Sequence, residues 1–172
     1  MRGVIMNERS AVELKTYDVL SALNIPFERI DHEAAMTMED CQCVEDALGV
    51  QACKNLFLRN TQKTRFYLLL LPGHKKFRTK DLSKQLGIAR LSFAEEEFME
   101  KYLGIRPGSV TVMGLMNDNE KQVTLLVDRD VYVQEYMGCH PCANTSSIKV
   151  KTQDIFEKFL PFTGHIPVLV DL

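Results

Sequence analysis

The chain lacks any long apolar run. Its longest stretch of consecutive aliphatic residues is Leu68–Leu71, whereas a membrane helix needs roughly 20 apolar residues. The first residues, Met1–Met6, also lack the apolar stretch of a signal peptide. We therefore expect a cytoplasmic protein with no membrane partner.

Cysteine is sparse and odd in number. The 172 residues include 5 Cys, which cannot all pair in disulfides within one chain. A reducing compartment is the simpler expectation. Hydrophobic residues make up 45% of the chain and charged residues 26%, values that indicate a folded protein rather than disorder. At this length we expect one domain over residues 1–172.

The sequence also lacks the motifs of several common enzyme classes. It contains no P-loop, GxGxxG, HExxH or GxSxG segment. Some residues could supply metal ligands, but their spacing is not that of a standard zinc site: Cys41, Cys43, Cys139, His140 and Cys142. A Cys–His nucleophile is disfavoured as well, because adjacent side chains seldom point at one another. We expect no metal and no cofactor.

What the chain does contain is a segregated block of positive charge. Lys and Arg number 21 against 23 Asp and Glu, so the net charge is −2. Residues 54–90 hold ten basic residues and one acid, Asp81, which makes this segment +9 and leaves −11 for the remainder. Such a block is typical of a surface that binds a polyanion, because phosphates respond to local charge. A solvated lysine-rich face is the alternative interpretation.

Hydrophobic periodicity and turn residues predict a mixture of helices and strands. Capping boxes at Ser10–Glu13 and Ser92–Glu95 each open a helix, with Ser accepting from a backbone N–H and Glu reaching back. Helices are expected over residues 10–25, 37–49, 79–87, 92–104 and 152–160. Extended runs are expected over residues 27–30, 54–58, 66–71, 110–115, 122–127, 148–150 and 166–170. Because strict βαβ alternation is absent, the order of elements predicts a single α+β domain around a mixed, curved sheet.

Two places carry side chains that are suited to chemistry. Lys54 and Asn55 stand at the mouth of an apolar strand, where the cation can meet a phosphate and the amide can donate and accept. A solvent-exposed pair at a strand end is the alternative. The second place is Gly138–Thr145, where glycine and proline can hold backbone groups in a fixed shape for a ligand. Within it, His140 is either an acid–base group or a plain exposed imidazole in a turn.

Several segments, taken in order, resemble one known family. They are Cys53–Leu58, Asp81–Leu82 with Arg90–Phe93, Leu103–Thr111, Gly114–Asp118, and His140–Pro141 with Asn144. In order and spacing they resemble the YbaK/ProX family of aminoacyl-tRNA deacylases, free-standing relatives of the editing domain inserted in bacterial prolyl-tRNA synthetases. The resemblance covers most of the chain, and it implies the editing-domain fold with helices flanking a barrel-like sheet.

The resemblance also implies a mechanism and a site. Lys54 would contact the phosphate of the terminal adenosine, and His140 would stand at the tip of a loop that faces the amino acid. Water, helped by the ribose hydroxyl of the substrate, is the implied attacker, so that the protein would position groups and stabilise charge. The implied substrate-binding residues are Asn55, Gly114, Gly138, Cys139, Pro141 and Asn144.

The Lys-Asn pair and the segment Leu103–Thr111 are closer to the ProX branch, which clears alanine from tRNA(Pro). The YbaK branch, which clears cysteine, usually has Lys-Thr at the first of these places. We therefore expect Ala-tRNA(Pro) as substrate, with Cys-tRNA(Pro) as the alternative. A small pocket would exclude proline by size. Its candidate lining residues, which could equally be plain core, are Met36, Phe57, Val112 and Met113.

The implied partner is the acceptor end of tRNA(Pro), with prolyl-tRNA synthetase as a candidate second partner. Two hypotheses from other classes compete with the deacylase. The first is a tRNA-binding or regulatory module on the same fold, which would bind tRNA without turnover. The second is a metal or redox sensor that uses the cysteines.

Overall fold

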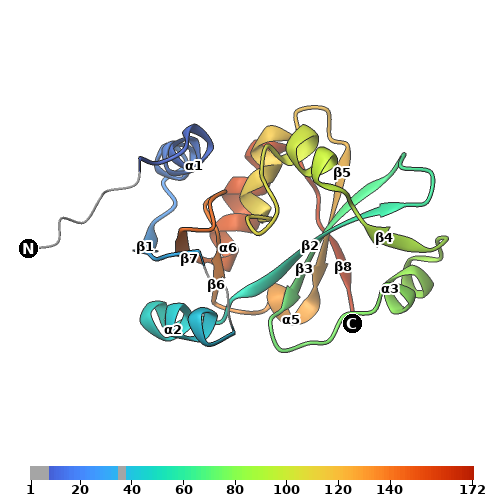
Figure 1. Cartoon of the computed structure of the whole chain (residues 1–172), viewed down its shortest axis with the longest axis horizontal. Coiled ribbons are helices and arrows are strands. Elements are labelled where there is room, and N and C mark those ends of the chain that lie inside the picture. Colours follow the sequence, from blue (N-terminus) through green and yellow to red (C-terminus); the bar gives the residue numbers. More distant parts are fainter. Residues whose placement is uncertain (1–7, 35–37) are drawn as a thin grey trace, which may run out of the picture.

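The computed structural model describes residues 8–34 and 38–172. Met36 and Thr37, the expected pocket residue and helix cap, lie outside these ranges. Within them no helix is long and apolar enough to cross a membrane. The described residues form helices and two β-sheets (Figure 1), so the expected α+β class is confirmed.

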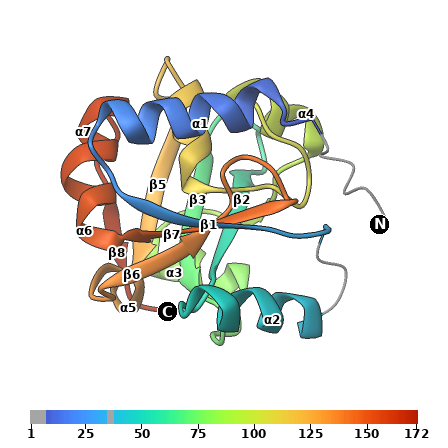
Figure 2. The same ribbon diagram turned by 90° about the vertical axis from the view of Figure 1, so that its left-hand side faces the viewer.

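The smaller sheet has three antiparallel strands in the order β1-β7-β6. These strands are β1 (Phe27–Asp31), β6 (Tyr136–Cys139) and β7 (Ser146–Lys151). Two helices flank this sheet, α1 (Ala11–Ala22) and α2 (Met38–Leu48). Figure 2 shows α1 across the top of the view and α2 along the bottom, with the three strands between them.

The larger sheet has five strands in the order β4-β2-β3-β5-β8. Their bounds are β2 (Cys53–Asn60), β3 (Phe66–Pro72), β4 (Leu91–Phe93), β5 (Val123–Asp128) and β8 (Val168–Val170). β2 pairs antiparallel with β3 and β4, whereas β5 pairs parallel with β3 and β8, so the sheet is mixed as expected. An isolated parallel bridge between Ala52 and Gly138 connects the two sheets. Among the described residues, neither sheet pairs its first strand with its last, so neither sheet is closed. The expectation of a barrel-like sheet is therefore not confirmed.

The other helical segments are short, apart from α3 (Thr79–Leu86), which packs against β4. In Figure 1, α3 lies at the opposite end of the molecule from α1 and α2. Two segments are π-helical, η1 and η3, and η2 is a 3₁₀ helix. The bounds are α4 (Glu96–Phe98), η1 (Met99–Leu103), η2 (Val112–Asn117), α5 (Arg129–Tyr132), α6 (Thr152–Asp154), η3 (Ile155–Phe159) and α7 (Leu160–Thr163).

Both predicted capping boxes need correction. The hydroxyl of Ser10 accepts a hydrogen bond from the backbone N–H of Glu13 at 3.3 Å, so the first half of that box is confirmed. The carboxylate of Glu13 does not reach back, because it is bound in a side-chain cluster that is described below. Ser92 caps no helix, since it lies in β4 opposite Arg59, and α4 begins after Glu95.

Two further segments differ from the expectation. The extended run expected at 110–115 is largely the 3₁₀ helix η2, whose first turn is capped by Thr111: its hydroxyl accepts from the N–H of Met113 at 3.3 Å. Gly138 and Cys139, which were expected in a loop, end strand β6. This strand is formed by pairing with β7, and the sequence around Gly138 does not predict that contact.

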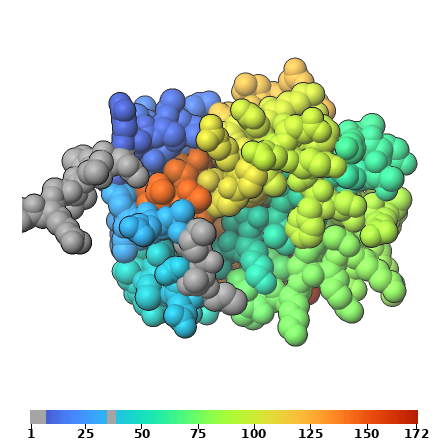
Figure 3. Space-filling model, in the orientation of Figure 1, coloured from blue at the N-terminus to red at the C-terminus, as the bar shows by residue number. Residues whose placement is uncertain are grey.

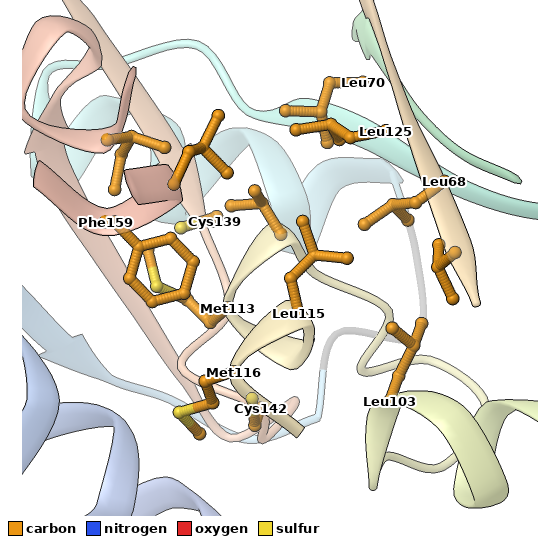
Figure 4. Close-up of a cluster of buried hydrophobic side chains, with 14 of the residues drawn as sticks. Leu68, Leu70, Leu103, Met113, Leu115, Met116, Leu125, Cys139, Cys142 and Phe159 are labelled. Atoms are coloured by element: carbon orange, nitrogen blue, oxygen red, sulfur yellow. The ribbon is translucent and has the colours of Figure 1, made fainter. Parts of the chain in front are cut away.

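β3 is buried along its whole length and organises the core. Alternate residues face two clusters, with Phe66, Leu68 and Leu70 in the larger one and Tyr67, Leu69 and Leu71 in the smaller one. Figure 4 shows part of the larger cluster, in which side chains of η2 gather with those of β3 and β5. Three of the residues considered for the pocket belong to this core instead, namely Phe57, Val112 and Met113.

Candidate active site

A cavity of about 290 Å³ lies where the two sheets meet beside α2. Its walls come from segments far apart in the sequence, and most of them are small or aliphatic side chains. Figure 3 shows the face where α2 (cyan), the segment after β6 (orange) and β2 (teal) come together. The lining residues are His32, Cys41, Val44, Glu45, Leu48, Val50, Ala52, Cys53, Asn55, Gly108, Val110, Gly138, Cys139, His140 and Ser147.

Gly138 lies in the wall of the cavity, at the bridge that joins the sheets. A Cβ atom at this position would stand 3.0 Å from Cγ1 of Val50 and 3.5 Å from the carbonyl oxygen of Gln51. A contact of 3.0 Å requires the neighbour to move. Glycine at 138 therefore permits the close approach of β6 to the start of β2, and this approach closes one end of the cavity.

His140 lines the cavity as a neutral ring with one unprotonated nitrogen. Its Nδ1 lies 2.9 Å from the carbonyl oxygen of Ser146. Because a carbonyl can only accept, Nδ1 carries the proton of the neutral ring, and Nε2 is left as an acceptor. Burial lowers the pKa of His140, and the nearby ring of His32 lowers it further, against the opposing effect of the Ser146 carbonyl. The ring is therefore neutral at physiological pH.

His32 lines the same cavity, with its ring centroid 6.3 Å from that of His140. Its Nδ1 lies 2.7 Å from the carbonyl oxygen of Glu33, and its Nε2 lies 2.8 Å from the hydroxyl of Ser147. Because a carbonyl can only accept, Nδ1 donates to Glu33, and the bond between Nε2 and Ser147 fixes the other side of the ring. Sequence reasoning missed this residue, and its pairing with His140 comes entirely from the β1–β7 contact.

A polar cluster built around the buried residues Glu13 and Ser146 holds the segment that carries His140. The hydroxyl of Ser146 lies 3.0 Å from Oε1 of Glu13 and 2.7 Å from Oδ1 of Asp31. Arg9 bridges the two carboxylates at 2.6 and 2.7 Å, and Tyr17 donates to Glu13 at 2.7 Å. Glu13 is only 2% exposed, so its charge depends on these partners. The cluster ties α1 to the strands β1 and β7.

The contacts within this cluster shift the pKa values of Asp31 and Tyr17. The hydrogen bond from Arg9 lowers the pKa of Asp31 to about 2, despite some opposing desolvation. Burial raises the pKa of Tyr17 to about 12, and its hydrogen bond to Glu13 acts in the same direction. Both groups therefore keep one charge state across the physiological range.

Asn55 lines the cavity and fixes one of its walls. Its Oδ1 accepts from the backbone N–H of Val112 at 3.1 Å, and its Nδ2 donates to the carbonyl of Cys53 at 3.1 Å. The first bond holds η2 and the preceding loop against β2. Asn55 is half-buried and part of the framework of the cavity, so it is not the solvent-exposed strand-end amide of the alternative interpretation.

Lys54 is not among the residues that line the cavity. Side chains alternate along a strand, and Cys53 and Asn55 both face the cavity, so Lys54 projects from the other face of β2. Its Nζ donates to the carbonyl of Lys75 at 2.6 Å. Lys54 thus stands beside the loop after β3, at the same end of β2 as the cavity but outside its walls.

The remaining expected residues are distributed around this centre. Cys139 lines the cavity, whereas Pro141 is buried in the turn that follows. The amide of Asn144 would lie 3.5 Å from a Cβ placed at Gly108, so the turn contacts the loop that forms another wall. Gly114 lies away from the cavity in η2, where an added Cβ would meet Leu103 at 3.1 Å.

Three of the cysteines at or beside the cavity, Cys53, Cys139 and Cys142, are protonated thiols. Burial raises the pKa of Cys53 to about 12 and that of Cys142 to about 11, and it also raises the pKa of Cys139. A thiol, unlike a thiolate, is a poor nucleophile. Across residues 8–34 and 38–172, no three His, Cys, Asp or Glu side chains gather as a metal site would require.

The fold and the cavity together define a class of protein. A small, mostly apolar chamber that is lined by a neutral imidazole suits hydrolysis by a positioned water. The comparisons with known proteins identify the family within this class. Residues 32–158 match the family described as the aminoacyl-tRNA editing domain, and the chain belongs to that family.

Individual relatives agree with this assignment. The chain is 28% identical over 167 residues to the prolyl-tRNA editing protein ProX of Acetoanaerobium sticklandii, covering 97% of this chain and 99% of that protein. It is 31% identical over 155 residues to the prolyl-tRNA synthetase associated domain-containing protein 1 of Danio rerio, covering 89% and 83%. The resemblance drawn from the sequence is confirmed, and with it the enzyme class, an aminoacyl-tRNA deacylase.

Solved structures share the fold. One, named as a candidate trans-editing enzyme for prolyl-tRNA synthetase, superimposes with a TM-score of 0.68 at 14% identity and covers 96% of this chain and 99% of that chain. At this identity the likeness concerns the fold alone.

Proposed function

We propose that the protein is a trans-editing enzyme that hydrolyses the ester of alanine mischarged on tRNA(Pro). The observation that carries the proposal is the neutral His140, whose Nε2 is an acceptor at the wall of a small apolar cavity. The family and the relative named a prolyl-tRNA editing protein support the tRNA part of the proposal. In this scheme residues 1–172 act as one editing domain in the cytoplasm, with tRNA(Pro) as partner and prolyl-tRNA synthetase as the source of the mischarged product.

The cavity walls support a small side chain on the substrate. Val44, Leu48, Val50 and Val110 are aliphatic, and they surround the space beside Gly138. Each extra methylene in such a pocket changes the free energy by about 1–3 kcal/mol, with the sign set by whether it fits. We propose that alanine fits between these side chains and that the ring of proline is excluded by contact with them.

Catalysis in this proposal rests on positioning. The backbone of Gly138, Cys139 and His140 faces the aminoacyl ester, and Nε2 of His140 accepts a proton of the attacking water or of the ammonium group. Water, oriented with the help of the ribose hydroxyl, attacks the ester carbon, and the ribose oxygen leaves with a proton. The thiols are not required as nucleophiles, since burial keeps them protonated.

The other residues have supporting roles in the proposal. Lys54 exchanges its bond to the carbonyl of Lys75 for the phosphate of the terminal adenosine at the rim of the cavity. Asn55 holds the wall formed by η2. Pro141, Asn144 and Gly114 shape the turn and the helix behind the walls rather than the cavity surface.

The test is a deacylation assay on tRNA(Pro) charged separately with alanine, cysteine, serine and proline. We expect rapid loss of alanine and survival of prolyl-tRNA(Pro). Faster hydrolysis of the cysteine ester would identify Cys-tRNA(Pro) as the substrate instead. Binding of tRNA without loss of any ester would refute the enzyme and leave a binding module.

A further inference from the structure

The basic block of residues 54–90 is not uniformly available to a ligand. Several of its cations are neutralised within the protein: Arg59 and Lys63 pair with Glu95, Lys75 pairs with Asp128 and Asp130, and Arg78 pairs with Asp81. Charges that are compensated at such short range add little to the field outside the protein. The segment charge of +9 therefore overstates what an external anion would meet.

Two of the remaining cations share a concave surface. A hollow of about 470 Å³ lies between α3 and the residue that precedes β4, and it is lined by Thr79, Lys80, Ser83 and Arg90. Lys80 and Arg90 are exposed, and among the described residues no carboxylate forms an ion pair with either. An arginine fork and a lysine ammonium that face one space are a suitable pair for a phosphate group.

The walls of this hollow are fixed by the fold. The hydroxyl of Ser83 donates to the carbonyl of Thr79 at 2.8 Å and lies 3.3 Å from the backbone N of Leu91, from which it accepts. Ser83 is 8% exposed, so this link between α3 and β4 is itself buried. Arg90 precedes Leu91 directly and is therefore held opposite the first turn of α3.

The hollow is also connected to the cavity by a short segment. Cys53, in the cavity wall, pairs with Pro72 at the end of β3, and a Cβ at Gly73 would lie 2.8 Å from the carbonyl oxygen of Ala52. Residues 73–78 then lead directly into α3. Six residues span at most roughly 20 Å, so a few nucleotides of a bound strand would cover the interval.

We propose that Lys80 and Arg90 bind a backbone phosphate of the acceptor stem of the tRNA whose aminoacyl end occupies the cavity. This inference rests on the proposed function and deepens it, because it names the surface that receives the body of the substrate. Contacts to phosphate carry no sequence information, so the hollow contributes affinity and register, whereas the cavity selects the amino acid.

The test compares K80E/R90E with the wild type in filter binding of uncharged tRNA(Pro) over a range of KCl concentrations. We expect the double variant to raise Kd at least tenfold and to reduce the slope of log Kd against log salt by about one, because both side chains contact the same phosphate. Lys151→Glu is the matched control, because Lys151 is also exposed, has no acidic partner among the described residues, and lies in the smaller sheet. It should change Kd no more than about twofold.

A second measurement distinguishes an effect on tRNA binding from an effect on ester hydrolysis. Hydrolysis of 3′-alanyl-adenosine, which has no stem, should be the same in K80E/R90E and the wild type, whereas KM for Ala-tRNA(Pro) should rise. An unchanged Kd and slope in the double variant, or an equal loss in Lys151→Glu, would overturn the inference. A wild type that binds tRNA but hydrolyses neither ester would refute the proposed function. The comparison of Kd between K80E/R90E and the wild type would still test whether the hollow binds tRNA.

Discussion

In the proposed mechanism, the protonation state of one ring, that of His140, decides whether the cavity can accept a proton. His140 is oriented by the carbonyl of Ser146, so its Nε2 works as an acceptor only while the ring is neutral. Since burial lowers its pKa, neutrality extends below the ordinary value of about 6.5. The neighbouring His32 acts in the same direction through its own positive potential when protonated.

A pH–rate profile tests this directly. Protonation removes the acceptor, so kcat/KM for Ala-tRNA(Pro) should fall on acidification with a midpoint below pH 6.5. His32→Asn removes a group that lowers the pKa of His140, and it should shift the fall toward higher pH. Initial rates between pH 5 and 8, corrected for the enzyme-free rate, give both profiles. A fall centred above pH 6.5 in the wild type would contradict the assignment.

The cluster behind Ser146 supplies a second prediction at this scale. Glu13→Gln keeps the shape of the side chain but removes the charge that Arg9 and Tyr17 contact. We expect a loss of about 1–3 kcal/mol in unfolding free energy, measured in urea, and a several-fold fall in kcat as the His140 segment loosens. Glu97→Gln, at an exposed position, is the control. Full stability and kcat in Glu13→Gln would show that the cluster is incidental.

Among single residues, the sequence located part of the site. Asn55, Gly138, Cys139 and His140 were predicted and do line one cavity. Lys54 was expected at the site because the family resemblance implies a contact with the terminal phosphate, whereas strand alternation places it on the opposite face of β2 from Asn55. This information was present in the sequence once the strand was recognised.

At the scale of elements, β6 and the start of β2 form the junction on which the cavity depends. Gly138→Ala should push its Cβ against Val50 and narrow the cavity. We expect kcat/KM for Ala-tRNA(Pro) to fall at least tenfold, with a stability loss of about 1–2 kcal/mol. The double variant Gly138→Ala/Val50→Ala removes the clash and should recover much of the activity. Full activity in the single variant, or no recovery in the double variant, would contradict this role for the glycine.

Elements whose signals are local were predicted well, and those that depend on distant partners were not. Phe66 to Leu71 form an apolar run bounded by turn residues, and this run is the buried strand β3. Ser92 carries a convincing capping pattern, but pairing of β4 with β2 overrides it. Strand β6 likewise exists because β7 is beside it, and nothing near Gly138 in the sequence encodes that neighbour.

For the whole molecule, the order of elements predicted the α+β class and the family resemblance implied tRNA as the partner, but neither predicted the shape of the site. His32, Val44, Leu48 and Val50 were not predicted, because each enters the cavity only when the two sheets meet at the Ala52–Gly138 bridge. The charge block was visible in the sequence. The distribution of ion pairs that leaves Lys80 and Arg90 available was not, since partners such as Glu95 and Asp128 lie outside the block.

The most direct measurement is the single-turnover rate of Ala-tRNA(Pro) hydrolysis at saturating enzyme, in the wild type and in His140→Ala. Saturation removes binding differences, so the rate reports on the chemistry in the cavity. His74→Ala, at an exposed histidine, is the matched control. We predict a fall of at least a hundredfold in His140→Ala and no more than a twofold change in His74→Ala. An unchanged rate in His140→Ala would contradict the account, because it would place the chemistry outside this cavity.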